Sequence, residues 1–284
     1  MDSVTPDIKT NYEICEDNHD VFTLPIIRAD DKVYLEELQR GELFMRNALY
    51  YQDDEEKDSR NDPYDSAVPV KNILEIKTDP EIGPVNHERL FGFGWFIKCF
   101  YQFKLSDLHR KNDGSYCLRM SDESKDWLSS LGKEYVIIIF NTRKFMQRFY
   151  TYCDSSGLRN LASPVSYLDD TEYREYSLAF VHEMLNVYAG KDLSQKLISP
   201  LLCKRKKYSI NQEFRVCVHY DDVNNDLFKE HGPIANLSYQ EMEAIQNKAT
   251  TEKIGSLADI SKICTLDEIL KLEIPIALGN KGKG

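Results

Sequence analysis

Apolar and polar residues alternate most regularly between Gln212 and Tyr220. One face of this segment would carry apolar side chains and the other mostly polar ones: first Phe214, Val216, Val218 and Tyr220, then Glu213, Arg215, Cys217 and His219. A period of two predicts a β-strand with one face toward the core. The polar face would then meet a cleft, a neighbouring helix or water, and its simplest interpretation is a solvent-facing row with a Glu–Arg surface pair.

Other patterns predict further elements. The unbroken apolar run from Tyr135 to Phe140 predicts a central strand that is buried on both faces. Helices are expected after Asp30 or Asp31, after Ser121 and after Asn141, because these residues can cap helix N-termini. The remaining expected strands are 22–28, 43–50, 68–76, 94–103, 163–168 and an edge strand at 274–278, and the remaining helices are 172–188, 238–247 and one opened by a capping box at Thr265.

This order mixes strand pairs with single helices, which favours an α+β fold over a regularly alternating parallel one. We expect a mixed, mostly antiparallel sheet flanked by helices. The sequence shows no internal repeat and no long linker. It therefore predicts an irregular lead-in over 1–22 and a single domain over 23–284.

Composition narrows the class of protein. The seven cysteines are odd in number, scattered and without a C-x-x-C pair, which predicts neither a disulfide framework nor a zinc site and favours a reducing, cytoplasmic setting. No apolar run approaches the roughly 18 residues of a membrane helix, and the N-terminus lacks a signal-peptide pattern. The net charge of −11 argues against non-specific binding to nucleic acid, except locally at Lys204 to Lys207. The simplest interpretation of that run is a solvated cluster at a helix end.

Common enzyme motifs are absent: the sequence has no phosphate-binding P-loop, no dinucleotide-binding glycine motif, no zinc-protease His pair and no nucleophile elbow. The acidic stretch 53–62 lacks the spacing of a calcium loop, and the six histidines are dispersed. No metal site is predicted.

Four short segments carry a resemblance. They are the stretch from Val33 to Met45, the motif Asn61-Asp-Pro-Tyr-Asp65, the segment from Cys99 to Tyr101, and the segment from Lys207 to Arg215. Together they resemble an uncharacterised bacterial family, a domain of unknown function associated with phage resistance of the abortive-infection kind and with mobile elements. The resemblance implies a fold more than an activity. Asn61 and Asp65 have a simpler interpretation as turn formers.

The order of elements is also similar to that of ADP-ribosyltransferases. By this analogy Arg28 would grip the pyrophosphate of NAD, Tyr101 would stack on nicotinamide, and Glu213 would stabilise the ribose cation as nicotinamide leaves. Candidate substrate-binding residues are Arg215, Tyr208, Gln212, Asn61 and Asp65. Arg215 could instead be the salt partner of Glu213, and Tyr208 a core aromatic.

Three hypotheses remain open. The first is an NAD-consuming transferase or hydrolase of a phage-defence or toxin system, with Glu213 at its centre. The second is a non-catalytic interaction or sensor module, similar to an antitoxin, whose acidic surface meets a basic partner. The third is a nuclease or nucleotide-processing enzyme that uses Glu213, His219 and the basic run at 204–207.

Overall fold

The computed structural model describes residues 24–51, 94–173, 175–177, 179–180, 199–220 and 247–276. Four expected segments lie wholly or mostly outside the described residues: the lead-in 1–22, the acidic loop 53–62, the strand 68–76 and the helix 238–247. The chain divides into two compact units, which we describe separately. Unit 1 comprises residues 1–42, 100–151 and 253–284, and unit 2 comprises residues 43–99 and 152–252. The structure has helices and a mostly antiparallel sheet, so the expected α+β class is confirmed.

The sheet of unit 1 is centred on the expected apolar strand. Its strands are β1 (Ile26–Asp30), β6 (Tyr135–Ile139), β12 (Ser261–Thr265) and the C-terminal end of β3 (Trp95–Gln102). Strand β6 pairs antiparallel with β1 on one side and with β12 on the other. Residues 136–139 are all buried, because both faces of β6 are covered. The prediction of a central strand is confirmed.

The helices of unit 1 begin where the capping residues predicted them. Helix α1 (Lys32–Gln39) follows Asp31, and α2 (Asp122–Ser130) follows Ser121, whose hydroxyl accepts a hydrogen bond from the Ser124 N–H. Helix α3 (Thr142–Ser155) follows Asn141, whose amide oxygen accepts from the Lys144 N–H at 2.9 Å. The side chains of Ser121 and Asn141 satisfy amide groups that the first helical turn leaves unpaired, whereas the Asp31 side chain makes no capping hydrogen bond to α1.

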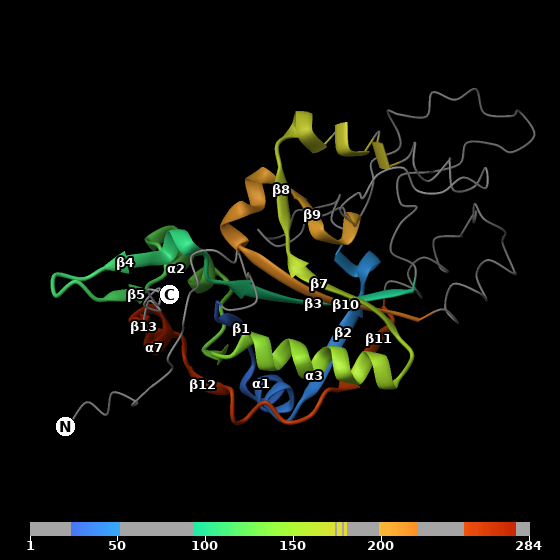
Figure 1. Cartoon of the computed structure of the whole chain (residues 1–284), viewed down its shortest axis with the longest axis horizontal. Coiled ribbons are helices and arrows are strands. Elements are labelled where there is room, and N and C mark those ends of the chain that lie inside the picture. Colours follow the sequence, from blue (N-terminus) through green and yellow to red (C-terminus); the bar gives the residue numbers. More distant parts are fainter. Residues whose placement is uncertain are drawn as a thin grey trace, which may run out of the picture. The chain divides into compact units, whose positions relative to one another are not determined.

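A second, smaller sheet completes unit 1. It contains β4 (Leu108–Arg110), β5 (Tyr116–Leu118) and β13 (Ile274–Ile276), with β5 in the centre. Helix α7 (Leu266–Leu270) precedes β13 and opens with the expected capping box between Thr265 and Glu268. Figure 1 shows α2 beside the β4–β5 hairpin, and their apolar residues Leu118 and Leu128 belong to one core cluster. The expected edge strand is confirmed at β13, whereas β4, β5 and β12 were not predicted.

Unit 2 contains the polar row of residues 213–219 and the basic run 204–207. Its elements are most of β2 (Glu42–Asn47), the 3-10 turn η1 (Ala48–Tyr51), the start of β3, β7 (Arg159–Pro164), β8 (Ser166–Leu168), η4 (Pro200–Leu202), β9 (Cys203–Arg205), η5 (Lys206–Asn211), β10 (Glu213–His219) and β11 (Ala249–Lys253). Strand β10 pairs with β7 and β3, and β8 lies parallel to β9. The expected strand 163–168 is divided between β7 and β8, and the expected strand 43–50 ends at Asn47.

Two expectations about unit 2 are wrong. The polar row of β10 does not face solvent: Arg215, Cys217 and His219 are buried, because Cys217 packs in a cluster with Ala48, Ile97 and Leu201. The basic run does not end a helix but spans β9 and the start of η5.

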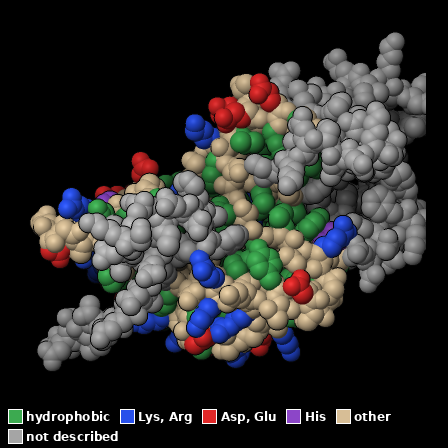
Figure 2. All heavy atoms as spheres, in the orientation of Figure 1, with side chains coloured by type: hydrophobic (Ala, Val, Ile, Leu, Met, Phe, Trp, Pro, Cys, Tyr) green, Lys and Arg blue, Asp and Glu red, His purple; other side chains and the backbone are tan. Residues whose placement is uncertain are grey.

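Charged side chains of both signs are interspersed on the face shown in Figure 2, without a large area of one sign. Within the described part of the chain, no helix is long and apolar enough to cross a membrane.

Candidate functional site

Glu213 lies at the centre of a buried ion cluster in unit 2. Its Oε1 accepts a hydrogen bond from Lys204 Nζ at 2.6 Å, and its Oε2 accepts from Arg215 Nε and Nη2 at 2.9 and 2.7 Å. The third side of the guanidinium donates through Nη1 to the carbonyl of Leu201 at 2.7 Å. The exposed fraction is 11% for the Glu213 side chain and 1% for each of the two cations. We call these three residues the ion triad.

The backbone before β10 places Glu213 in this position. Gln212 ends the 3-10 turn η5 in the left-handed region, with φ 39° and ψ 49°, a conformation that is uncommon for residues other than glycine. The N–H of Glu213 then donates to the Tyr167 hydroxyl at 2.8 Å. Tyr167 comes from β8 and lies opposite Lys204 in the parallel β8–β9 pair. Residues far apart in the sequence are thus gathered around one carboxylate.

The charges of the ion triad keep Glu213 ionised. Burial by itself would raise the pKa of its carboxyl group. The charges of Lys204 and Arg215, and the hydrogen bonds that they donate, outweigh this effect and hold the pKa well below its usual range. Burial raises the pKa of the Tyr167 hydroxyl, which stays protonated beside the carboxylate.

Tyr208 links the ion triad to the basic run. Lys204 Nζ lies 5.3 Å from the centre of its ring, Lys207 Nζ 4.9 Å and the guanidinium carbon of Arg205 5.5 Å. Cations at these distances are attracted to the negative face of an aromatic ring. Tyr208 is itself buried, whereas Lys206 and Lys207 are exposed. The run therefore places positive charge both at the surface and in contact with Glu213.

Arg28 and Tyr101, which were expected to act with Glu213 as an ADP-ribosyltransferase triad, do not lie on one face of their sheet. Arg28 and Tyr101 belong to unit 1, where Ile27 is the register partner of Tyr101. Paired residues share a face and adjacent residues alternate, so Arg28 and Tyr101 project from opposite faces of that sheet. Arg28 is ion-paired with Asp30 at 3.2 Å. Tyr101 is 3% exposed and packs against Phe103 and Trp127.

Of the residues proposed for a nuclease, the basic run meets Glu213 through Lys204, but His219 lies apart from them. His219 ends the strand that Glu213 begins, and six residue steps of a strand span about 20 Å. Its ring is buried against Trp95 at 4.9 Å between centres, and Arg159 Nη2 approaches its Nδ1 at 2.8 Å. His219 therefore lies in the interior, away from the ion triad.

Among the expected substrate-binding residues, Arg215 belongs to the ion triad, and Gln212 and Tyr208 flank it. Asn61 and Asp65 lie outside the described residues. Sequence patterns missed Lys204 as the partner of Glu213 and missed Tyr167 altogether. The only sequence signal for Lys204 was its place in the basic run.

The described residues contain no group of three or more His, Cys, Asp or Glu side chains that could hold a metal ion. Their six cysteines are free thiols. Comparison of the chain with protein families, with curated proteins and with solved structures finds no match. The resemblance to a phage-resistance family stays a prediction.

Proposed function

We propose that unit 2 binds a phosphate-bearing nucleotide beside the ion triad, and that the protein consumes NAD there as a cytoplasmic phage-defence or toxin effector. The observation that carries the proposal is the ionised Glu213 carboxylate, which is held by two cations next to the basic run. ADP-ribosyl transfer needs such a carboxylate to stabilise a positively charged ribose, and cations to bind the pyrophosphate.

Both oxygens of Glu213 are engaged, so substrate binding would require an exchange of partners. A phosphate could take the ammonium group of Lys204, which would free Oε1 to accept a hydrogen bond from a ribose hydroxyl. Arg215 would keep the carboxylate ionised and in position through Oε2. The bond between ribose C1′ and nicotinamide would then break, with its electron pair leaving on nicotinamide. Water or a nucleophile of the target would bond to C1′ and lose its proton.

In this scheme Arg28 and Tyr101 have no role at the reacting atoms. Tyr167, whose hydroxyl accepts from the Glu213 N–H, and Tyr208, whose ring lies beside Lys204, are aromatic residues of the same unit close to the carboxylate.

The engagement of both oxygens also favours a second candidate, a non-catalytic interaction module whose ion triad is structural. Buried charges with complete hydrogen bonding occur in proteins without catalytic roles. This candidate predicts a stable complex with a partner protein and no turnover of any nucleotide.

Release of nicotinamide separates the two candidates. Purified protein is incubated with NAD, alone and with cell lysate, and the products are separated by chromatography. Glu213→Gln is compared with Glu175→Gln, since Glu175 is an exposed carboxylate of the same unit. Release by the wild type and by Glu175→Gln, but not by a folded Glu213→Gln, supports the transferase. Calorimetry of NAD binding to the wild type gives an answer even if Glu213→Gln does not fold, and neither binding nor release would reject the proposal.

A further inference from the structure

Two aromatic side chains of unit 2 stand exposed around one arginine. Phe44 of β2 is 40% exposed, and Tyr50 of η1 is 44% exposed. The guanidinium carbon of Arg46 lies 5.4 Å from the centre of the Phe44 ring and 4.4 Å from the centre of the Tyr50 ring. At these distances the cation is attracted to the faces of both rings. We call these three residues the aromatic–arginine patch.

Strand pairing explains why the rings stay uncovered. Side chains alternate along β2, so Phe44 and Arg46 project from the face opposite to its buried residues. Strand β11 lies beside β2 (Figure 1), and the Asn47 N–H donates to the carbonyl just before β11 at 3.1 Å. Because β11 continues from that bond along β2, the pair is antiparallel and places Ala249 and Thr251 opposite Arg46 and Phe44. Both residues are exposed and too short to cover a ring.

The charge of Arg46 is available to a ligand. Arg46 makes no hydrogen bond or ion pair with a described residue. The carboxylate of β2, Glu42, lies four residues earlier and is ion-paired with Arg40 at 3.5 Å. The N–H groups of a guanidinium lie in its plane and form a fork that matches a phosphate, while its flat faces stack on rings. The patch therefore combines aromatic surface with one uncompensated positive charge.

The turn η1 connects the patch with the ion triad inside unit 2. The rings of Tyr50 and Tyr51 meet edge to face, with 5.6 Å between their centres. Tyr51 packs against the cluster that contains Leu201, and the Leu201 carbonyl accepts a hydrogen bond from Arg215 Nη1 at 2.7 Å. The patch and the ion triad thus belong to one continuously packed region.

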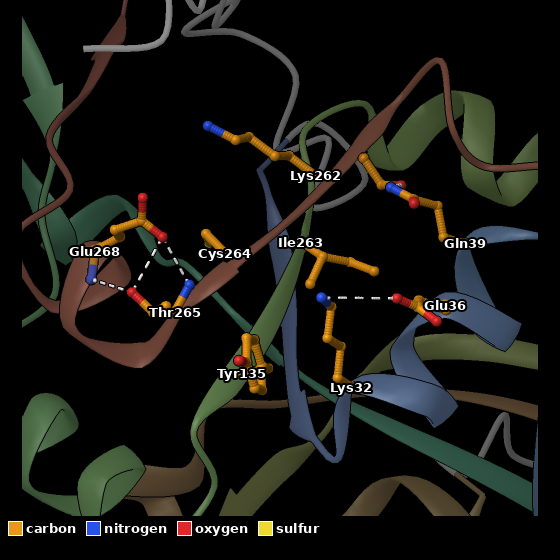
Figure 3. A pocket seen from close by; sticks show the side chains of 10 residues that line it. Lys32, Glu36, Gln39, Tyr135, Lys262, Ile263, Cys264, Thr265 and Glu268 are labelled. Carbon is orange, nitrogen blue, oxygen red and sulfur yellow. Dashed lines mark hydrogen bonds and ion pairs between the residues drawn. The ribbon is translucent and has the colours of Figure 1, made fainter. Parts of the chain in front are cut away.

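The groove along β12 in unit 1 offers a contrast (Figure 3). It has a volume of about 470 Å³, and its charged lining consists of two lysines and two glutamates: Lys32, Lys262, Glu36 and Glu268. Lys32 and Glu36 compensate each other at 4.0 Å. The charges of this groove balance, so it does not favour a phosphate.

We propose that the aromatic–arginine patch binds the adenosine end of the nucleotide, with adenine stacked on the exposed rings and a ribose phosphate on the fork of Arg46. Bases stack on exposed aromatic side chains, and a cation beside the ring adds to the attraction. The inference rests on the function proposed above, in which Lys204 takes a phosphate and Glu213 faces the ribose that loses nicotinamide. It assigns the recognition of adenine to residues outside the ion triad.

Calorimetry with the full chain tests the patch through adenosine monophosphates, which carry a base and a phosphate but no nicotinamide. Saturable binding of 5′-AMP or of 2′-AMP is expected, and the tighter of the two identifies the ribose phosphate that Arg46 binds. Ribose 5-phosphate lacks the base and should bind at least about fivefold more weakly, because a stacked base contributes that much or more.

Five variants locate the binding. Tyr50→Leu and Arg46→Gln should each weaken binding of the preferred AMP at least about fivefold, through loss of stacking and of the charged fork. Tyr34→Leu and Arg110→Gln change exposed residues of unit 1 and should leave the affinity unchanged. Lys262→Gln, in the groove of Figure 3, should also leave it unchanged.

Two outcomes separate the patch from the proposed function. AMP binding that depends on Tyr50 and Arg46, without release of nicotinamide from NAD, would support the patch and reject NAD consumption. Release that depends on Glu213, with a KM for NAD that Tyr50→Leu and Arg46→Gln leave unchanged, would overturn the patch alone. The patch is also overturned if neither AMP saturates the protein, or if the two patch variants bind AMP as the wild type does.

Discussion

Lys204 and Glu213 stand nine residues apart in the sequence and meet inside unit 2 through a 2.6 Å ion pair. The chain between them forms the 3-10 turn η5 and the left-handed Gln212. Removing ions from water is costly, and only good geometry offsets the cost. The two residues therefore depend on each other, and each should be far more damaging to remove than an exposed charge.

Replacement of Lys204 by Met should lower the free energy of unfolding by about 3 kcal/mol, because Glu213 would stay buried with one cation fewer. Urea denaturation measures the change, and Lys206→Met, an exposed member of the same run, should change stability by less than about 0.5 kcal/mol. The double variant with Glu213→Gln should lose less than the sum of the single losses. A loss below 1 kcal/mol for Lys204→Met would show that the ion pair between Lys204 and Glu213 is not needed for stability.

The ion triad also predicts how stability depends on pH. The pKa of Glu213 is held well below its value of about 4.5 in the unfolded chain, so its contribution is fully present above that value. As the pH falls below about 4.5, the unfolded chain takes up a proton that the folded chain does not, and stability decreases. The wild type should therefore lose more stability between pH 5 and pH 3 than Glu213→Gln. Equal losses of stability in the two proteins would contradict a Glu213 pKa that is lower in the folded than in the unfolded chain.

Local signals predicted the helices of unit 1 and its central strand β6, but not the strands β4, β5 and β12. The apolar run of β6 and the caps at Ser121 and Thr265 act within a few residues, so sequence alone identifies them. Strand β12 was missed because it lies at the edge of the sheet, where partial burial of all five residues leaves no alternation to detect. Strand β11 was missed for a similar reason, since only Glu252 in it is buried.

The sequence predicted only those contacts of the candidate site that join residues close together in the chain. Glu213 and Arg215 share a strand face, so their pairing was foreseen as the simpler role of Arg215. Their burial was not, because it depends on Leu201 and Ala48 packing against the same face of β10. The approach of Lys204 depends on β9 pairing with β8, a contact between segments 37 residues apart that no short pattern encodes.

Glu252 offers a test of a buried carboxylate held by hydroxyl groups. It is 1% exposed and accepts hydrogen bonds from Tyr152 at 2.6 Å, and from Tyr220 and Thr250 at 2.7 Å each. Glu252→Gln replaces one acceptor oxygen with an amino group that faces donors, which should cost about 1–3 kcal/mol. Thermal or urea unfolding measures it against the exposed Glu175→Gln as control. If Glu252→Gln and Glu175→Gln have the same free energy of unfolding, the three hydroxyl groups do not require a carboxylate as their acceptor.

Gly41 and Gly157 form a matched pair for the last prediction. Both have positive φ, +92° and +65°, so alanine at either position should cost about 1–2 kcal/mol of backbone strain. The two positions differ in the room that they leave for a side chain. A Cβ on Gly41 would lie 2.1 Å from the carbonyl oxygen of Gly255, whereas a Cβ on Gly157 would meet nothing within 4 Å. The neighbour at Gly41 is backbone in unit 1, where the Ile254 N–H donates to the Gly41 carbonyl at 3.0 Å, so it cannot turn aside as a side chain would.

Gly41→Ala should therefore lose about 3 kcal/mol more than Gly157→Ala, because overpacking adds to the strain. Denaturation of the two variants side by side measures the difference and cancels the shared cost of positive φ. Equal losses would mean that the chain around Gly255 moves away freely. A large excess for Gly41→Ala would instead establish that the end of α1 and the segment before β12 are held in direct backbone contact.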